Sequence, residues 1–130
     1  MKLGIVVSTW YWEDITSKML DLAVKKAKEH GIETEIVKVP GSHDITLGVK
    51  RLLKKKEIDG VVTLGAVVQG KTYHDVVIMH ALAKTLQELS LEFEKPVMLG
   101  VNGPRMTLEQ AIERIQRAED VMEACIKWLK

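Results

Sequence analysis

The segment GAVVQGKT, residues 65–72, combines residue types that can bind phosphate. It fits the P-loop pattern G-x-x-x-x-G-K-[ST], in which backbone N–H groups surround phosphates, a lysine reaches the outer phosphate and a threonine hydroxyl holds magnesium. Two consecutive valines inside the pattern favour an extended backbone and resist the wrapped loop that a nucleotide requires. The match to a nucleotide site is therefore weak, although Lys71 and Thr72 at the start of a helix could hold a single phosphate.

A histidine stands two residues beyond this pattern. His74 follows Gly70 and Thr72 in a G-x-T-x-H arrangement, and a histidine side chain can give and take protons near neutral pH. His30 and His80 fit exposed or packing positions on helices instead. His74 is therefore the candidate for proton transfer.

Short apolar runs predict the strands that must position these residues. Four of them, at residues 3–7, 35–39, 60–64 and 96–101, are typical of strands buried on both faces of a parallel sheet. Stretches with helical spacing separate them, and the connections are short. This alternation predicts an α/β fold, a three-layer sandwich with a four-stranded parallel sheet and helices on both faces.

The helices are predicted from apolar stripes and caps. The residues expected to face the core are Ile15, Met19, Ala23 and Ala27 in the first helix and Val49, Leu52 and Leu53 in the second. A third helix covers residues 73–93. The last helical region begins with a capping box of Thr107 and Gln110, turns Leu108 inward, and continues as one helix over residues 116–130.

Most of the reactive residues fall in the four loops that follow the strands. These loops are residues 8–12, 40–44, 65–74 and 102–105. In open parallel sheets, ligands bind beyond the carboxyl ends of the strands. We therefore expect a functional site where these loops meet.

Composition and charge limit the classes of function. A chain of 130 residues is long enough for one core, so we expect a single domain over residues 1–130. A net charge of +1 argues against nucleic-acid binding, and no apolar run reaches the roughly 18 to 20 residues of a membrane span. The single cysteine, Cys125, excludes an internal disulfide and indicates a buried thiol in a reducing, cytoplasmic compartment. The expected partner is a small molecule or another protein.

Five parts of the sequence, in order, resemble one enzyme family. They are GIVVSTW followed by DITSKML, VPGSHDI, IDGVVTLGAVVQGKTYHDVV, KPVMLGVNGP and TLEQAIER. Together they span nearly the whole chain. The chain resembles the 6,7-dimethyl-8-ribityllumazine synthases of riboflavin biosynthesis, and most nearly the archaeal ones.

This resemblance implies a flavodoxin-like fold and a transferase. Enzymes of this family condense 5-amino-6-(D-ribitylamino)uracil with 3,4-dihydroxy-2-butanone 4-phosphate and release phosphate and two waters. They use no metal and no organic cofactor. They assemble as pentamers, sometimes as a 60-subunit shell of twelve pentamers, with active sites between neighbouring subunits.

The resemblance also implies roles for particular residues. His74 matches the catalytic histidine, and Trp10 matches the aromatic residue that stacks on the uracil ring, while Tyr11 and Trp12 stay unassigned. The other positions that match substrate contacts are Ser42, His43 and Asp44 for the ribityl chain, the backbone of Ala66, Val67 and Val68 for the pyrimidine, and Leu99 for the pocket wall.

The same resemblance implies that Lys71, Thr72 and Arg114 bind the phosphate, with Arg114 reaching in from the adjacent subunit. Two of the assigned residues have a simpler alternative. An arginine on an amphipathic helix is usually just solvated, and Asp44 could merely place a favourable charge in the first turn of a helix.

Three hypotheses stay open from the sequence. The first is an active lumazine synthase. The second is an oligomeric relative that binds the ligand or serves as an assembly scaffold with weak or no turnover, because His43, Asp44 and Tyr11 depart from the residues of the family. The third is a phosphate or nucleotide switch that uses the P-loop pattern.

Overall fold

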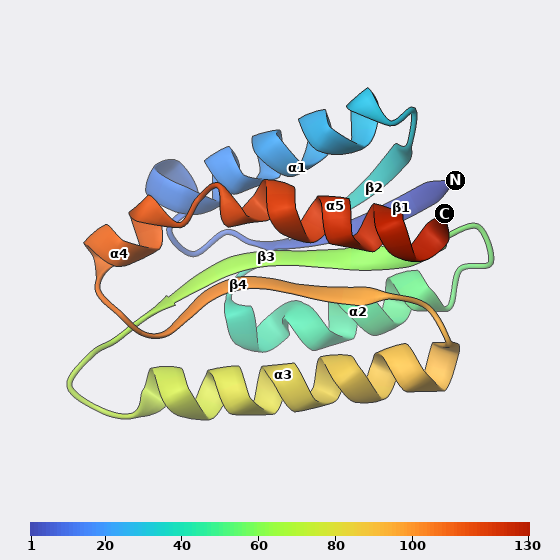
Figure 1. The fold of residues 1–130 in the computed structure, drawn as a ribbon. Helices are drawn as coiled ribbons and strands as arrows, with labels where there is room; N and C mark the ends of the chain where they lie inside the picture. The colour runs from blue at the N-terminus through green and yellow to red at the C-terminus, as the bar shows by residue number, and fades with distance from the viewer.

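Four parallel strands form one sheet at the centre of the molecule, in the order β2-β1-β3-β4 (Figure 1). The computed structural model describes residues 1–130. The strands are β1 (Lys2–Ser8), β2 (Glu33–Val39), β3 (Gly60–Val68) and β4 (Val97–Met106). β1 pairs with β2 and β3, and β3 also pairs with β4. Parallel neighbours need a crossover connection, and here one or two helices follow each strand.

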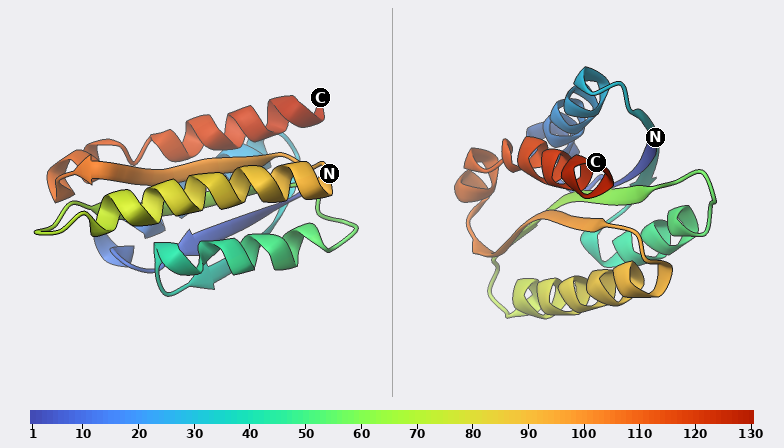
Figure 2. Two further views of the ribbon diagram at one scale, coloured as in Figure 1. Left: turned by 90° about the horizontal axis from the view of Figure 1, so that it is seen from below. Right: turned by 45° about the vertical axis from the view of Figure 1, so that its right-hand side comes forward.

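Helices cover both faces of the sheet, which confirms the predicted three-layer α/β sandwich. They are α1 (Ser17–Glu29), α2 (Ile45–Leu53), α3 (His74–Phe93), α4 (Leu108–Glu113) and α5 (Arg117–Leu129), with the short turns η1 (Trp12–Thr16) and η2 (Ser42–Asp44) before α1 and α2. α1 and α5 lie on one face, and α2 and α3 lie on the other (Figures 1 and 2). The strand order is the flavodoxin-like one. None of these helices combines the length and the apolar character that crossing a bilayer demands.

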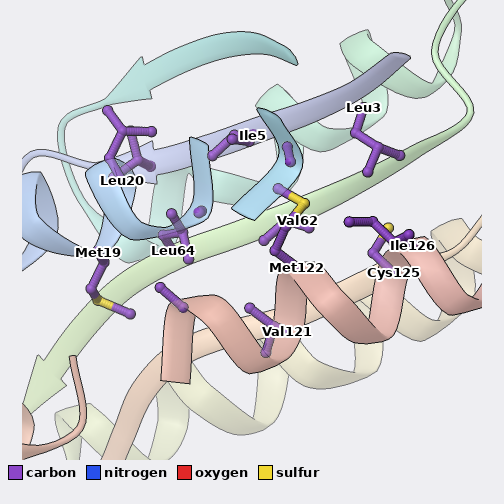
Figure 3. Close-up of a cluster of buried hydrophobic side chains, with 14 of the residues drawn as sticks. Leu3, Ile5, Met19, Leu20, Val62, Leu64, Val121, Met122, Cys125 and Ile126 are labelled. Atoms are coloured by element: carbon purple, nitrogen blue, oxygen red, sulfur yellow. The ribbon is translucent and has the colours of Figure 1, made fainter. Parts of the chain in front are cut away.

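Each face of the sheet has its own hydrophobic core. Side chains alternate along a strand, so Ile5 and Val7 of β1 pack toward α1 and α5. Val6, between them, packs toward α2 and α3. Figure 3 shows the first core, where Val62 of β3 and Met122 of α5 lie close together. Burying one such side chain stabilises the fold by about 1.5–3 kcal/mol relative to leaving it in water. The central strands β1 and β3 are therefore held from both faces.

The predicted stripe of the first helix is confirmed. Its four predicted core residues are completely buried, Ile15 in η1 and Met19, Ala23 and Ala27 in α1. The chain leaves α1 through Gly31, whose φ of 67° lies in the left-handed region that glycine adopts at little cost. Cys125 of α5 is also fully buried, and burial raises the pKa of its thiol to about 12. The thiol is therefore protonated and shielded, as the sequence indicated.

Two strands are longer than the sequence pattern predicts. β3 continues through residues 65–68 and β4 through residues 102–106, whereas we expected loops at residues 65–74 and 102–105. The two extensions pair with each other, Ala66 with Asn102 and Val68 with Met106, with an irregularity between them. The proline in the second extension suggests a turn, but β4 is an edge strand, whose outer side tolerates a residue without an N–H group.

The C-terminal helical region differs from the prediction because it breaks into two helices. Its capping box is confirmed: the Thr107 N–H donates to Gln110 Oε1 at 2.9 Å, and the Gln110 N–H donates to Thr107 Oγ1 at 3.2 Å. α4 ends after six residues, and Leu108, expected to face inward, is 38% exposed. Arg114 therefore lies in the turn between α4 and α5 rather than along a continuous helix.

Candidate active site

A cleft of about 360 Å³ opens at the carboxyl ends of β1 and β3. Its volume is typical of small-molecule sites. The residues that line it are Trp10, Tyr11, Gly41, Ser42, His43, Ala66, Val67, Val68, His74 and Ile78. All of them except Ile78 of α3 come from three of the four segments that were expected to meet. The cleft thus brings together most of the residues predicted to contact the pyrimidine substrate, and the predicted catalytic histidine.

Trp10 offers a flat apolar surface beside the cleft. Its side chain is 64% exposed, and the Tyr11 ring stands edge-on to it, with 6.5 Å between the ring centroids. The Trp10 N–H donates to Ser8 Oγ at 3.2 Å, which fixes the chain as it leaves β1. Trp12 does not line the cleft, because its ring lies under Lys38, whose Nζ is 4.5 Å from the ring centroid. Tyr11, which the sequence left unassigned, therefore joins Trp10 as a cleft residue.

The cleft wall contains a buried hydroxyl without a partner. Ser42 is 7% exposed, and its Oγ makes no hydrogen bond within the chain. Gly65 leaves room for this hydroxyl, since a Cβ at that position would lie only 3.1 Å from Ser42 Oγ. An unpaired buried polar group costs about 1–3 kcal/mol. A ligand hydroxyl or carbonyl that bonds Ser42 would remove this cost.

β3 has an open side where it borders the cleft. β1 pairs with β3 only as far as Leu64, opposite Val7, whereas β3 continues to Val68. Beyond Leu64, the backbone N–H and C=O groups on the side toward β1 therefore have no strand partner. Such groups can hydrogen-bond the edge of a planar heterocycle. The same extended backbone excludes the wrapped conformation of a nucleotide P-loop, as the paired valines indicated.

His74 is the first residue of α3 and lines the cleft one turn before Ile78. Its side chain is exposed. Its backbone N–H donates to Thr72 Oγ1 at 3.3 Å, a contact that helps to fix the start of the helix. A solvent-accessible imidazole in a cleft wall can exchange protons with both a ligand and water.

Five predicted contact residues lie outside the cleft lining, namely Asp44, Lys71, Thr72, Leu99 and Arg114. Asp44 Oδ2 accepts a hydrogen bond from the Gly41 N–H at 3.0 Å, so this carboxylate caps the turn η2. That local role is close to the simpler alternative that the sequence left open. Lys71 and Thr72 are exposed on the connection between β3 and α3, and the Thr72 hydroxyl accepts a hydrogen bond from the backbone.

Leu99 and Arg114 belong to a different cavity, of about 180 Å³, beside the edge strand β4. Asn102 and Arg117 also line it. The Asn102 Nδ2 donates to the carbonyl oxygens of Ala111 and Arg114, at 3.1 and 3.2 Å. Asn102 thereby ties the turn that carries Arg114 to β4. Within one chain, Leu99 and Arg114 are not brought together with the cleft residues.

An ion pair that the sequence does not predict lies directly beside His74. Asp75 is 1% exposed, and its Oδ2 accepts hydrogen bonds from the Arg105 N–H at 2.8 Å and from Arg105 Nε at 3.1 Å. Burial opposes ionisation of this carboxyl, but the hydrogen bonds and the charge of Arg105 outweigh burial and lower the pKa of Asp75. The two residues are 30 positions apart, and no local sequence signal joins them.

The donor atoms in the cleft suit an organic ligand. No group of three or more histidine, cysteine, aspartate or glutamate side chains is placed to hold a metal ion. The cleft offers backbone groups, a hydroxyl, two imidazoles and aromatic surfaces. These can bind a flat, polyhydroxylated molecule and transfer protons.

Known proteins are similar in sequence to this chain over its whole length. Residues 1–130 match the family model described as 6,7-dimethyl-8-ribityllumazine synthase. Curated relatives of that name include those of Sulfolobus acidocaldarius (48% identical, over 100% of this chain and 83% of the relative), Metallosphaera sedula (50%, over 98% and 85%) and Picrophilus torridus (43%, over 100% and 96%). The chain therefore belongs to the 6,7-dimethyl-8-ribityllumazine synthase family, enzymes that are transferases of riboflavin biosynthesis.

Proposed function

We propose that this cleft condenses 5-amino-6-(D-ribitylamino)uracil with 3,4-dihydroxy-2-butanone 4-phosphate to give 6,7-dimethyl-8-ribityllumazine, phosphate and two waters. The observation that carries the proposal is the meeting of four features in one cleft: an exposed indole, an open strand edge, an unpaired hydroxyl and an imidazole. Each feature answers one need of the reaction. These needs are stacking, pyrimidine recognition, ribityl recognition and proton transfer.

The uracil substrate binds against Trp10 and the end of β3. The Trp10 ring stacks on the pyrimidine, and the open backbone of residues 66–68 bonds its polar edge. Ser42 and His43 contact the ribityl hydroxyls. Asp44 supports them by capping the turn on which both residues lie.

His74 transfers protons during the chemical steps. The uracil amine attacks the ketone carbon, and a C–N bond forms as water leaves to give an imine. The butanone then loses the proton at C3 as its C4–O bond to phosphate breaks, and the resulting enol tautomerises to a carbonyl. The ribitylamino nitrogen attacks this carbonyl, which closes the ring and releases the second water. The amine loses protons and the departing hydroxyl gains one, so one imidazole near neutral pH serves both directions. Holding two reactants in a single cleft supplies a further large part of the rate.

The phosphate lies where two subunits meet. Lys71 and Thr72 come from the subunit that supplies His74, and Arg114 with Leu99 comes from its neighbour. Two observations support this arrangement: Arg114 occupies a separate cavity within its own chain, and large apolar side chains, Tyr73 and Val77, are exposed at the start of α3. The assembly is a pentamer of single-domain subunits, and twelve pentamers can close into a shell. Light scattering measures the mass of the assembly and distinguishes a pentamer from a shell of twelve pentamers.

The proposed setting is the cytoplasm, where a metabolic enzyme meets both substrates. A reducing compartment suits a chain whose only cysteine is a buried free thiol.

An activity assay with a matched histidine control tests this function. The protein is incubated with both substrates, and lumazine absorbance and phosphate release are followed together. His74→Ala should slow product formation by about 10-fold or more, within the range of general acid–base catalysis. His80→Ala changes an exposed histidine on the same helix that does not line the cleft, and should leave the rate unchanged. Product formation by the unaltered protein at only the spontaneous rate would refute the proposed function.

A further inference from the structure

Arg105 contacts the residues on both sides of His74. Its backbone N–H and its Nε both donate to Asp75 Oδ2, at 2.8 and 3.1 Å. Its guanidinium carbon lies 5.6 Å from the centroid of the Tyr73 ring, a distance at which a cation is attracted to an aromatic face. Tyr73 and Asp75 flank His74 where the chain enters α3. One residue of β4 therefore holds both neighbours of the proposed catalytic histidine.

Two features of this contact are unfavourable by themselves. The Asp75 carboxylate is almost completely buried, and its Oδ1 has no hydrogen-bond partner, a situation that an ionised group tolerates only beside a countercharge. Arg105 has a φ of 60°, in the left-handed region that favours glycine. A glycine at this position would relieve the backbone but would remove the ion pair. The side-chain contacts of Arg105 offset this backbone cost.

The segment before His74 has few other anchors. Residues 69–73 form neither helix nor strand, and a Cβ added at Gly70 would meet nothing within 4 Å. The only side-chain hydrogen bond to the His74 backbone comes from the exposed Thr72. The direction of the His74 side chain therefore depends on the first turn of α3, and Arg105 ties that turn to the sheet.

We propose that Arg105 is a positioning residue for His74. Arg105 acts through Asp75 and Tyr73 and does not itself line the cleft. The inference rests on the catalytic role proposed above for His74. Proton transfer requires the imidazole within hydrogen-bond reach of the reacting atoms, so a small displacement of α3 slows the chemical steps. Substrate binding depends on other residues and stays largely intact.

A double-mutant cycle between Arg105 and His74 tests the inference. Arg105→Gly should lower kcat by about 10-fold, because misplacement of a catalytic group slows chemistry, while KM for each substrate changes less than about twofold. In the His74→Ala background, the same substitution should change kcat by less than about twofold, because no imidazole is left to position. Glu94→Gly is the matched control. It relieves a φ of 50° at the other end of α3 and should leave kcat unchanged.

A conservative variant keeps the test decisive. Arg105→Lys retains the positive charge but loses Nε and the planar guanidinium, so about half of the loss in log kcat should be recovered. If Arg105→Gly does not fold, Arg105→Lys carries the cycle by itself, with a loss of about threefold that disappears in the His74→Ala background. Equal losses with and without His74, or an unchanged kcat in both Arg105 variants, would overturn the inference. A His74→Ala variant with normal kcat would remove His74 from the mechanism and the inference with it, whereas product formation by the unaltered protein at only the spontaneous rate would refute the proposed function.

Discussion

The two sides of β3 differ at its carboxyl end, where the cleft opens. Toward β1, pairing stops at Leu64, and the backbone beyond it borders the cleft. Toward β4, pairing continues to Val68, opposite Met106. The open side has main-chain groups that can bind a ligand, and the buried, unpaired Ser42 hydroxyl lies next to it. The paired side extends β4, from which Asn102 and Arg105 hold other segments in place. One side of β3 thus borders the cleft where a ligand can be recognised, and the other side supports β4, which holds the Arg114 turn and the start of α3 in position.

The largest effect is expected on the paired side, from Asn102→Ala. The substitution removes the two hydrogen bonds that Asn102 Nδ2 donates, while the carbonyls of Ala111 and Arg114 each keep a backbone donor, the N–H of Arg114 and of Arg117. The free energy of unfolding should fall by about 2 kcal/mol, since each lost hydrogen bond contributes about 1 kcal/mol. Because the Arg114 turn is released, KM for the butanone phosphate should also rise, while KM for the uracil substrate stays the same. Urea denaturation and steady-state kinetics measure these quantities, and a rise in both KM values would contradict the division between the two sides.

A smaller effect is expected on the open side, from Ser42→Ala, which should weaken substrate binding without lowering stability. Its hydroxyl has no partner in the chain, so the free energy of unfolding should be unchanged or slightly higher. The dissociation constant of the uracil substrate should rise about 5-fold, the worth of one hydrogen bond of about 1 kcal/mol. Calorimetry measures this constant. Ser90→Ala is the control: its Oγ donates to the Lys95 carbonyl at 2.8 Å, so stability should fall without a change in binding.

Gly65→Ala should give a still weaker effect on the same side. The new Cβ would lie 3.1 Å from Ser42 Oγ, so the hydroxyl must move by a few tenths of an ångström. We expect the uracil substrate to bind about 2- to 3-fold more weakly and the unfolding free energy to change by less than about 1 kcal/mol, because the contact is tight but adjustable. Gly70→Ala, where the added carbon meets nothing, should change neither quantity. An equal effect of the two substitutions would rule out a steric cause.

The smallest effect is expected on the pH dependence of stability, from Asp75, which Arg105 contacts on the paired side. Hydrogen bonds from Arg105 lower the pKa of Asp75 against the opposing effect of burial, so the unfolded chain takes up this proton first as the pH falls. The stability that Asp75 contributes is therefore complete above its unfolded pKa of about 3.9 and is lost as the pH falls through the lower folded value. The urea midpoint of the unaltered protein should decline more steeply between about pH 5 and about pH 3 than that of Asp75→Asn.

Glu35 provides the control for this measurement. Its pKa is also lowered, chiefly by its hydrogen bond with Lys55, so Glu35→Gln should flatten the pH dependence through a site far from α3. The two flattenings should add, because the pairs share no residue. A pH dependence that only Glu35→Gln changes would show that Asp75 contributes nothing.

Sequence patterns predicted the fold well because the core is built from periodic apolar residues. The stripe of α1, the buried central strands β1 and β3 and the capping box of α4 each depend on residues close together in the chain. The expectation that β2 is buried on both faces was wrong, because β2 is an edge strand without a fully buried residue. The cleft followed from the rule that strand ends gather at one edge of a parallel sheet. His74 and Trp10 lie in that cleft for this reason.

The errors share a different cause, contacts between residues distant in sequence. Pairing between Ala66 and Asn102 turned two expected loops into strand. Asn102 holds the carbonyls at the end of α4, where a continuous apolar pattern suggested no break. The pairing of Asp75 with Arg105 depends on tertiary structure alone, so no local pattern could reveal it.

The open side of β3 also affects how mutagenesis of this protein should be interpreted. The groups proposed to recognise the pyrimidine belong to the main chain, and the side chains of Ala66 and Val67 pack into the core. An alanine scan would therefore report the packing of these residues and miss their part in recognition. Replacing the amide of one of these residues with an ester, which deletes a single N–H donor and keeps every side chain, addresses the main chain directly.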